Sequence, residues 1–121
     1  MSIFTIAVHA GRVAPAKPGT PSAPAIVTAT TWAQADSIAL DAALGDERAG
    51  YVYSRYGGPT QEALEAAVAA LEQGAGAAVY GSGMAALHAA LLEAGAKPGA
   101  VVVAASELYG ATTSLLNFLA A

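Results

Sequence analysis

The sequence predicts the opening of an α/β domain, in which a parallel-rich sheet carries helices on both faces, preceded by an extended N-terminal arm. From residue 58 onward, helical segments alternate with short apolar runs in the order helix, strand, helix, strand, helix. Such alternation is typical of parallel strands joined by right-handed crossovers. Residues 1–57 show little helical periodicity, so we expect them to lie on another surface rather than to form a core.

Prolines mark the arm. Four of them recur at every third position and favour an extended, polyproline-like path: Pro15, Pro18, Pro21 and Pro24. Residues 26–32 are rich in β-branched side chains but have no obvious hairpin mate. A short helical turn is expected over residues 36–44, before Gly45. The arm is therefore expected to be mostly irregular.

The first regular element is a helix that begins at Pro59, whose missing N–H is harmless in a first turn. Glu62 near this end suits the helix dipole. Gly74 is the expected C-terminal stop. One face carries an apolar stripe made of Leu64, Val68 and Leu71.

Two further strand–helix steps follow. Residues 77–80 are predicted to form a short buried strand, and residues 81–83 a tight junction into a second helix that ends near Gly95. Residues 97–99 are a turn signal with proline followed by glycine. Residues 100–105 contain three consecutive valines, as expected for a parallel strand covered on both faces.

A third helix is expected to open near Ala111 and is still running at Ala121. Two strands make too small a sheet to be stable alone. The sequence is therefore expected to be a fragment of a longer chain, with residues 58–121 as the first part of an α/β domain.

Composition narrows the classes of function. Of the 121 residues, 12% are charged, against about 25% in a typical globular domain. The formal net charge is −4 and the basic residues form no patch, so nucleic acid is not expected as a partner. Cysteine is absent and neither His9 nor His88 has ligand-spaced partners, so no metal site is expected.

No membrane partner is expected either. The start of the chain is apolar but lacks the basic region of a signal peptide. Residues 73–92 contain no charged residue, yet glycines interrupt them and a strand–turn–helix explains them better than a membrane span. We therefore expect a cytoplasmic protein.

Residues 51–56 gather three tyrosines and an arginine in an otherwise apolar chain. Phenol hydroxyls and a guanidinium are suited to grip a phosphate or carboxylate. Residues 81–84 lead from a predicted strand into a helix N-terminus, where free N–H groups favour an anion. The plainer alternative is that Ser82 merely caps the helix. Tyr109, on the next loop, is a candidate stacking platform for a planar cofactor.

A competing hypothesis is a dinucleotide-binding module. Gly81, Gly83 and Ala86 fit the degenerate Gly-x-Gly-x-x-Gly/Ala fingerprint, and Glu107 lies about 20 residues further on. A long proline-rich arm is unusual before such a unit. The hypothesis also leaves the Tyr53 and Arg55 cluster without a role.

Motifs in a fixed order resemble one family. They are T-I-A-V-H-A-G at residues 5–11, Tyr53-Ser54-Arg55 with Pro59-Thr60, Leu64-Glu65, Leu71-Glu72, residues 82–86 and Leu108-Tyr109-Gly110-x-Thr112. This set is similar to the opening third of the Cys/Met-metabolism pyridoxal-phosphate-dependent enzymes, the cystathionine γ-synthase/γ-lyase group of fold type I. The resemblance implies pyridoxal 5′-phosphate as the cofactor and an amino-acid substrate.

The resemblance also implies residue roles. Ser82, Gly83 and Met84 would hold the cofactor phosphate in their own subunit, and Tyr109 would stack on the pyridine ring and assist proton transfer. Tyr53 and Arg55 would reach the phosphate of a neighbouring subunit, which implies a homodimer or homotetramer with shared active sites. Residues 1–57 would then be the arm that clasps the neighbour.

Departures from the family pattern bear on these roles. Gly58 stands where the family usually has asparagine, and Ala111 where methionine γ-lyases carry a reactive cysteine, which disfavours that subfamily. Lys17 and Lys97 precede prolines and are poor Schiff-base candidates. The family's Schiff-base lysine is expected beyond residue 121, so this chain alone should be inactive. Another alternative is a non-catalytic remnant that assembles with a full-length paralogue.

Overall fold

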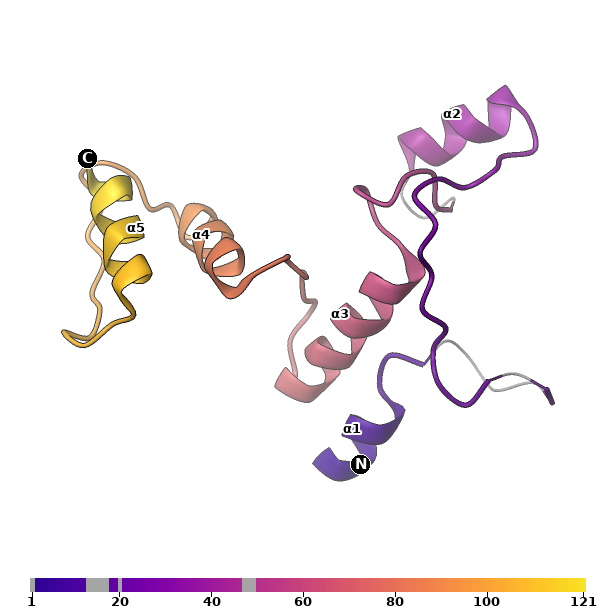
Figure 1. Cartoon of the computed structure of the whole chain (residues 1–121), viewed down its shortest axis with the longest axis horizontal. Helices are drawn as coiled ribbons and strands as arrows, with labels where there is room; N and C mark the ends of the chain where they lie inside the picture. The colour runs from indigo at the N-terminus through magenta and orange to yellow at the C-terminus, as the bar shows by residue number, and fades with distance from the viewer. Residues whose placement is uncertain (1, 13–17, 20, 47–49) are drawn as a thin grey trace. The chain divides into compact units, whose positions relative to one another are not determined.

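The computed structural model describes residues 2–12, 18–19, 21–46 and 50–121. Pro15 and Lys17, which entered the sequence predictions, lie outside the described residues. The described part contains helices and no strand (Figure 1): α1 Ile3–His9, α2 Ser37–Gly45, α3 Pro59–Glu72, α4 Gly83–Glu93 and α5 Gly110–Ala120. Contacts divide the chain into two compact units, Met1–Ala77 and Ala78–Ala121.

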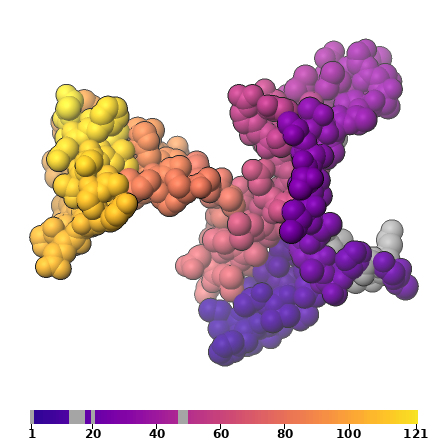
Figure 2. Space-filling model, in the orientation of Figure 1, coloured from indigo at the N-terminus to yellow at the C-terminus, as the bar shows by residue number. Residues whose placement is uncertain are grey.

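Helix α1 corrects the expectation that the N-terminal arm has no regular helix before residue 36. Ser2 caps it, because its hydroxyl oxygen accepts a hydrogen bond from the N–H of Thr5 at 3.3 Å. The helix packs on α3, and Figure 2 shows the indigo atoms of α1 against the rose atoms of α3. Tertiary packing thus stabilises a segment of only 7 residues that is too short to be helical alone.

Gly11 makes the close approach of α1 and α3 possible. Its φ is +75°, which side chains rarely adopt, and a Cβ atom there would overlap the carbonyl oxygen of Ala63 on α3. The Cβ atom would also lie 3.2 Å from that of Ala67. Backbone and small side chains therefore form this contact.

Helix α2 confirms the predicted helical turn over residues 36–44. Asp36 is its N-cap, and its carboxylate accepts a hydrogen bond from the N–H of Ala39 at 2.7 Å. Within the part of the chain that the structure describes, Ala43 on this helix is the one buried hydrophobic residue, with 6% of its surface exposed. This unit therefore has almost no core of its own.

The β-prone residues 26–32 have no hairpin mate, as expected from the sequence, but the structure pairs them with a distant segment. Thr31 and Tyr53 form an isolated antiparallel bridge. The N–H of Trp32 donates to the carbonyl of Val52 at 3.1 Å, and that of Ser54 to the carbonyl of Thr30 at 2.9 Å. Because the mate lies more than 20 residues away and has no hairpin turn, no local pattern reveals it.

Helix α3 begins at Pro59 as predicted and ends at Glu72 with Gln73 as its C-cap, so the expected stop, Gly74, directly follows it. The left-handed residue at this end is Gln73, with φ +54°. The predicted apolar stripe is also largely uncovered, since Leu64 and Val68 are 51% and 39% exposed. Alanines rather than this stripe face Gly11 at the end of α1.

The second unit confirms its predicted helices and turn. Ser82 caps α4, its hydroxyl oxygen accepting from the N–H of Ala85 at 3.1 Å. Gly95 follows that helix with φ +85°. The N–H of Ala100 donates to the carbonyl of Lys97 at 2.9 Å, and Gly99 has φ +84°, as the proline–glycine turn requires.

The two predicted strands, residues 77–80 and 100–105, are not formed in the described structure. Val101 and Val103 are 90% and 93% exposed, so no second layer covers them. A strand exists only when a neighbouring strand accepts its ladder of hydrogen bonds. The sheet prediction is therefore unconfirmed here. An apolar run favours a strand, but the strand forms only beside a neighbouring strand, and none is present among the described residues.

Among the described residues, no helix is both long enough and apolar enough to cross a bilayer.

Candidate functional site

The junction before α4 has the features of an anion cradle. The hydroxyl oxygen of Ser82 bonds the N–H of Ala85, and the carbonyl of Ser82 bonds that of Ala86. Among the described residues, the N–H groups of Gly83 and Met84 have no such partner, as is usual for a first helical turn. A Cβ atom at Gly83 would meet nothing within 4 Å. Two N–H donors therefore remain free at the positive end of the helix dipole, and there is open space beside Gly83.

Thr112 joins this cradle to the start of α5. Its hydroxyl donates to the sulfur of Met84 at 3.7 Å, so the first turns of α4 and α5 lie in contact. Tyr109 is the N-cap of α5 and is 73% exposed. The structure thus brings the predicted phosphate-binding residues and the predicted stacking tyrosine to one end of a helix pair. The sequence placed Thr112 in a motif but did not predict this contact.

Tyr53 and Arg55 also lie together, in the first unit. A guanidinium nitrogen of Arg55 donates to the Tyr53 hydroxyl at 3.2 Å, and the guanidinium carbon lies 5.0 Å from the centroid of that ring. Tyr56 packs edge-on against Tyr53, with 5.9 Å between ring centroids. The exposed guanidinium retains further N–H donors, so this pair is suited to an incoming anion.

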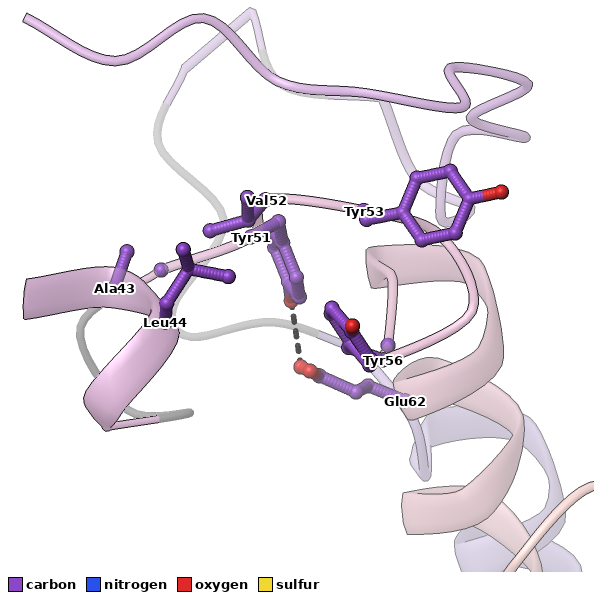
Figure 3. A pocket seen from close by; sticks show the side chains of 9 residues that line it. Ala43, Leu44, Tyr51, Val52, Tyr53, Tyr56 and Glu62 are labelled. Atoms are coloured by element: carbon purple, nitrogen blue, oxygen red, sulfur yellow. Dashed lines mark hydrogen bonds between the residues drawn. The ribbon is translucent and has the colours of Figure 1, made fainter. Parts of the chain in front are cut away.

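A cavity of about 410 Å³ opens beside this pair. Figure 3 shows Tyr51 and Tyr56 turned toward Glu62, whereas the ring of Tyr53 points away from it. The lining residues are Ala43, Leu44, Gly50, Tyr51, Val52, Tyr53, Tyr56, Gly57 and Glu62. The cavity is therefore bounded by the end of α2, residues 50–57 and the first turn of α3.

Tyr51 and Glu62 are the functional candidates that sequence reasoning missed as a pair. The Tyr51 hydroxyl donates to a carboxylate oxygen of Glu62 at 2.6 Å. This hydrogen bond, with partial burial and the negative charge of Glu62, raises the pKa of Tyr51 from 10.0 to about 12. The residues lie 11 positions apart across a turn, so no helical or strand periodicity links them.

The predicted site residues therefore form two groups. Tyr53 and Arg55 belong to the first unit, and Ser82, Gly83, Met84 and Tyr109 belong to the second. Each group is ordered by its own local contacts, and the ligand roles assigned to both remain predictions.

Comparison with known proteins identifies the chain's relatives. The family model described as "Cys/Met metabolism PLP-dependent enzyme" matches residues 4–121. A cystathionine gamma-synthase from Mycobacterium tuberculosis is 41% identical over 93% of this chain and 27% of its own length. An L-methionine gamma-lyase from Streptomyces avermitilis is 44% identical over 96% of this chain and 30% of its own.

A third relative, an O-acetyl-L-homoserine sulfhydrylase from Leptospira meyeri, is 36% identical over 94% of this chain and 25% of its own length. The chain thus spans between a quarter and a third of the length of these relatives. Because the family model matches nearly every residue, from 4 to 121, the chain belongs to the Cys/Met metabolism PLP-dependent enzymes.

Proposed function

We propose that the chain is the N-terminal part of a pyridoxal-phosphate enzyme that acts on sulfur amino acids or activated homoserine esters. The reaction class is β/γ-elimination or γ-replacement. The observation that carries the proposal is the match to this family over residues 4–121. The relatives include synthases, a lyase and a sulfhydrylase, so the proposal covers the class rather than one substrate.

The local chemistry fits the cofactor. A phosphate needs N–H donors, positive potential and room to approach; the start of α4 offers the N–H groups of Gly83 and Met84, its dipole, and open space beside Gly83. The hydroxyl proton of Ser82 is free to donate as well, since its oxygen serves as the acceptor in the cap. Tyr109, exposed at the adjoining helix start, offers a ring face of the right type for a pyridine.

In the reaction, bound pyridoxal phosphate supplies an electron sink for negative charge that develops on a substrate carbon. The α4 junction would fix the phosphate and so set the position of the ring. Tyr109 would cover one face of the ring, exclude water from it and hold a proton at its hydroxyl near the substrate. Each role requires only groups that the chain itself supplies.

The proposal assigns Tyr53 and Arg55 to the phosphate of a neighbouring subunit. This assignment is supported by the chemistry of the pair. The Tyr53 phenol holds the exposed guanidinium of Arg55, which still has N–H donors available for a phosphate. The enzyme would then be a cytoplasmic homodimer or homotetramer with shared active sites. Residues 1–57 would be the clasping arm, and residues 58–121 the first part of the fold type I large domain with its parallel-rich sheet.

Family membership replaces the dinucleotide hypothesis. The fingerprint at Gly81, Gly83 and Ala86 lies within a match to a pyridoxal-phosphate family. The glycines serve the same physical purpose in either case, which is to let a phosphate approach a helix N-terminus. A non-catalytic remnant of the family remains an alternative that the experiment below distinguishes.

The first test uses the full-length protein. Purified enzyme should show the visible absorption band of bound cofactor, and Arg55→Ala should weaken its affinity for pyridoxal phosphate by about tenfold or more, the value of a lost hydrogen bond to a charged group. Arg12→Ala is the matched control, an exposed arginine of the same unit that should have no effect. Absence of the band would favour the remnant, and unchanged affinity in Arg55→Ala would refute the intersubunit role.

A further inference from the structure

We propose that Tyr51 and Glu62 are positioning residues, whose hydrogen bond braces residues 51–56 against α3 and thereby aims the Tyr53–Arg55 pair at the cofactor phosphate. The inference rests on the proposed function of Tyr53 and Arg55. It concerns how the short segment that carries Arg55 keeps the guanidinium in one position, rather than how the guanidinium binds phosphate.

One set of hydrogen bonds and a ring contact attach residues 51–56 only to the preceding part of the N-terminal arm. The bridge at Thr31 and the hydrogen bonds of Trp32 and Ser54 attach it to residues 30–32. The side-chain amide of Gln34 donates to the carbonyl of Tyr51 at 2.9 Å, and the rings of Trp32 and Tyr51 lie 5.4 Å apart. All of these partners belong to the N-terminal arm.

The connection to α3 is much looser. Gly57 and Gly58 join the segment to Pro59, and Gly57 has φ +158°. Two successive glycines permit many backbone directions. Gly58 is the N-cap of α3 and provides no side-chain cap. The first turn of α3 already has one hydrogen bond with the arm, donated by the N–H of Val27 to the Thr60 hydroxyl at 2.9 Å, but that contact does not involve residues 51–56. A direct attachment of residues 51–56 is still needed to fix their direction relative to α3.

The Tyr51–Glu62 hydrogen bond provides that attachment. At 2.6 Å between oxygens it has the short length of a charge-assisted bond, which is the stronger kind. Glu62 lies in the first turn of α3, and Tyr51 lies two residues before Tyr53. The bond therefore links residues 51–56 to α3 on the far side of Gly57 and Gly58, and both of its residues line the cavity (Figure 3).

The same cavity provides a matched control. Tyr56 also lines it and is 70% exposed, but in the described residues its hydroxyl has no hydrogen-bond partner. Tyr51→Phe and Tyr56→Phe remove the same atom from neighbouring rings. Only the first breaks the brace.

The experiment measures the affinity of the full-length apoenzyme for pyridoxal phosphate and for pyridoxal, which lacks the phosphate. Tyr51→Phe should weaken pyridoxal phosphate binding about tenfold, the effect of losing one hydrogen bond to a charged group, and leave pyridoxal binding unchanged. Glu62→Gln, which keeps an acceptor but loses the charge, should give a smaller loss in the same direction. Tyr56→Phe should match the wild type.

A double-mutant cycle separates positioning from general destabilisation. In an Arg55→Ala background, Tyr51→Phe should cause no further loss, since it acts through the arginine. An equal loss in both backgrounds, or an equal loss for pyridoxal, would overturn the inference. The inference would also be overturned if Tyr51→Phe kept the wild-type affinity for pyridoxal phosphate while Arg55→Ala lost affinity. Full affinity in Arg55→Ala itself would instead refute the underlying function.

Discussion

The phenol of Tyr51 shows how one contact sets the chemistry of a residue. Its hydroxyl donates to the carboxylate of Glu62, so the neutral phenol is stabilised and its pKa rises to about 12. A tyrosine with a raised pKa adds stability that is fully present below its ordinary value of 10.0 and is lost as the pH rises through about 12. The relevant window is therefore alkaline, and neutral pH leaves the brace intact.

This predicts that Tyr51 ionises only in strongly alkaline solution, because the hydrogen bond to Glu62 raises its pKa to about 12. NMR of ring-labelled tyrosine in the full-length protein, followed through alkaline pH, should show a phenol signal that titrates near pH 12 and that Tyr51→Phe removes. Tyr56→Phe should leave it in place. A Tyr51 signal that titrates near 10.0 would mean that the hydrogen bond to Glu62 does not form in solution.

At the scale of elements, the caps were the most predictable features. Pro59 starts α3 and Ser82 caps α4, each by a local rule about unsatisfied N–H groups, while Asp36, where a helical turn was expected to begin, proves to be the cap of α2. The short α1 was not predicted although Ser2 caps it, because a helix of 7 residues is too short to be stable alone and its packing on α3 cannot be read from the local sequence. Helices with strong local signals were found from the sequence, and those held by distant packing were missed.

The cap at Ser82 yields a prediction that separates structure from binding. Ser82→Ala removes the bond to the N–H of Ala85 and should cost about 1 kcal/mol of stability. It also removes a hydroxyl beside the two free N–H groups, so affinity for pyridoxal phosphate should fall severalfold. Ser2→Ala removes the equivalent cap of α1. Both variants are compared by denaturant unfolding and cofactor titration, and equal cofactor affinity in the two would contradict a role for Ser82.

For the whole molecule, exposure is the dominant feature. Among the described residues only Ala43 is a buried hydrophobic, whereas Val101 and Val103 are more than nine-tenths exposed. Hydrophobic burial is the main favourable term in folding, so a chain with so little of it has little to offset its conformational entropy. The valines and the Leu64–Val68 stripe are surfaces that need a cover.

A protein consisting of residues 1–121 alone is therefore expected to show no cooperative unfolding transition. Circular dichroism during heating should change gradually, while the full-length enzyme should unfold over a narrow range. Added pyridoxal phosphate should not restore a sharp transition. A steep melt of the short chain would show that its two units contain a core that the structure does not reveal.

The sequence by itself determined the helices that start with strong caps, the proline–glycine turn and the ordered motifs that revealed the family. These depend on nearest neighbours along the chain or on fixed residue types, which are readable without coordinates. Only the tertiary structure decided that residues 30–32 pair with the Tyr53 segment, that α1 forms against α3 and that Tyr51 bonds Glu62. Each joins residues brought together by chain direction in space, which no local periodicity encodes. The predicted strands depend on the same kind of distant partner, and for that reason an apolar run alone did not form a sheet.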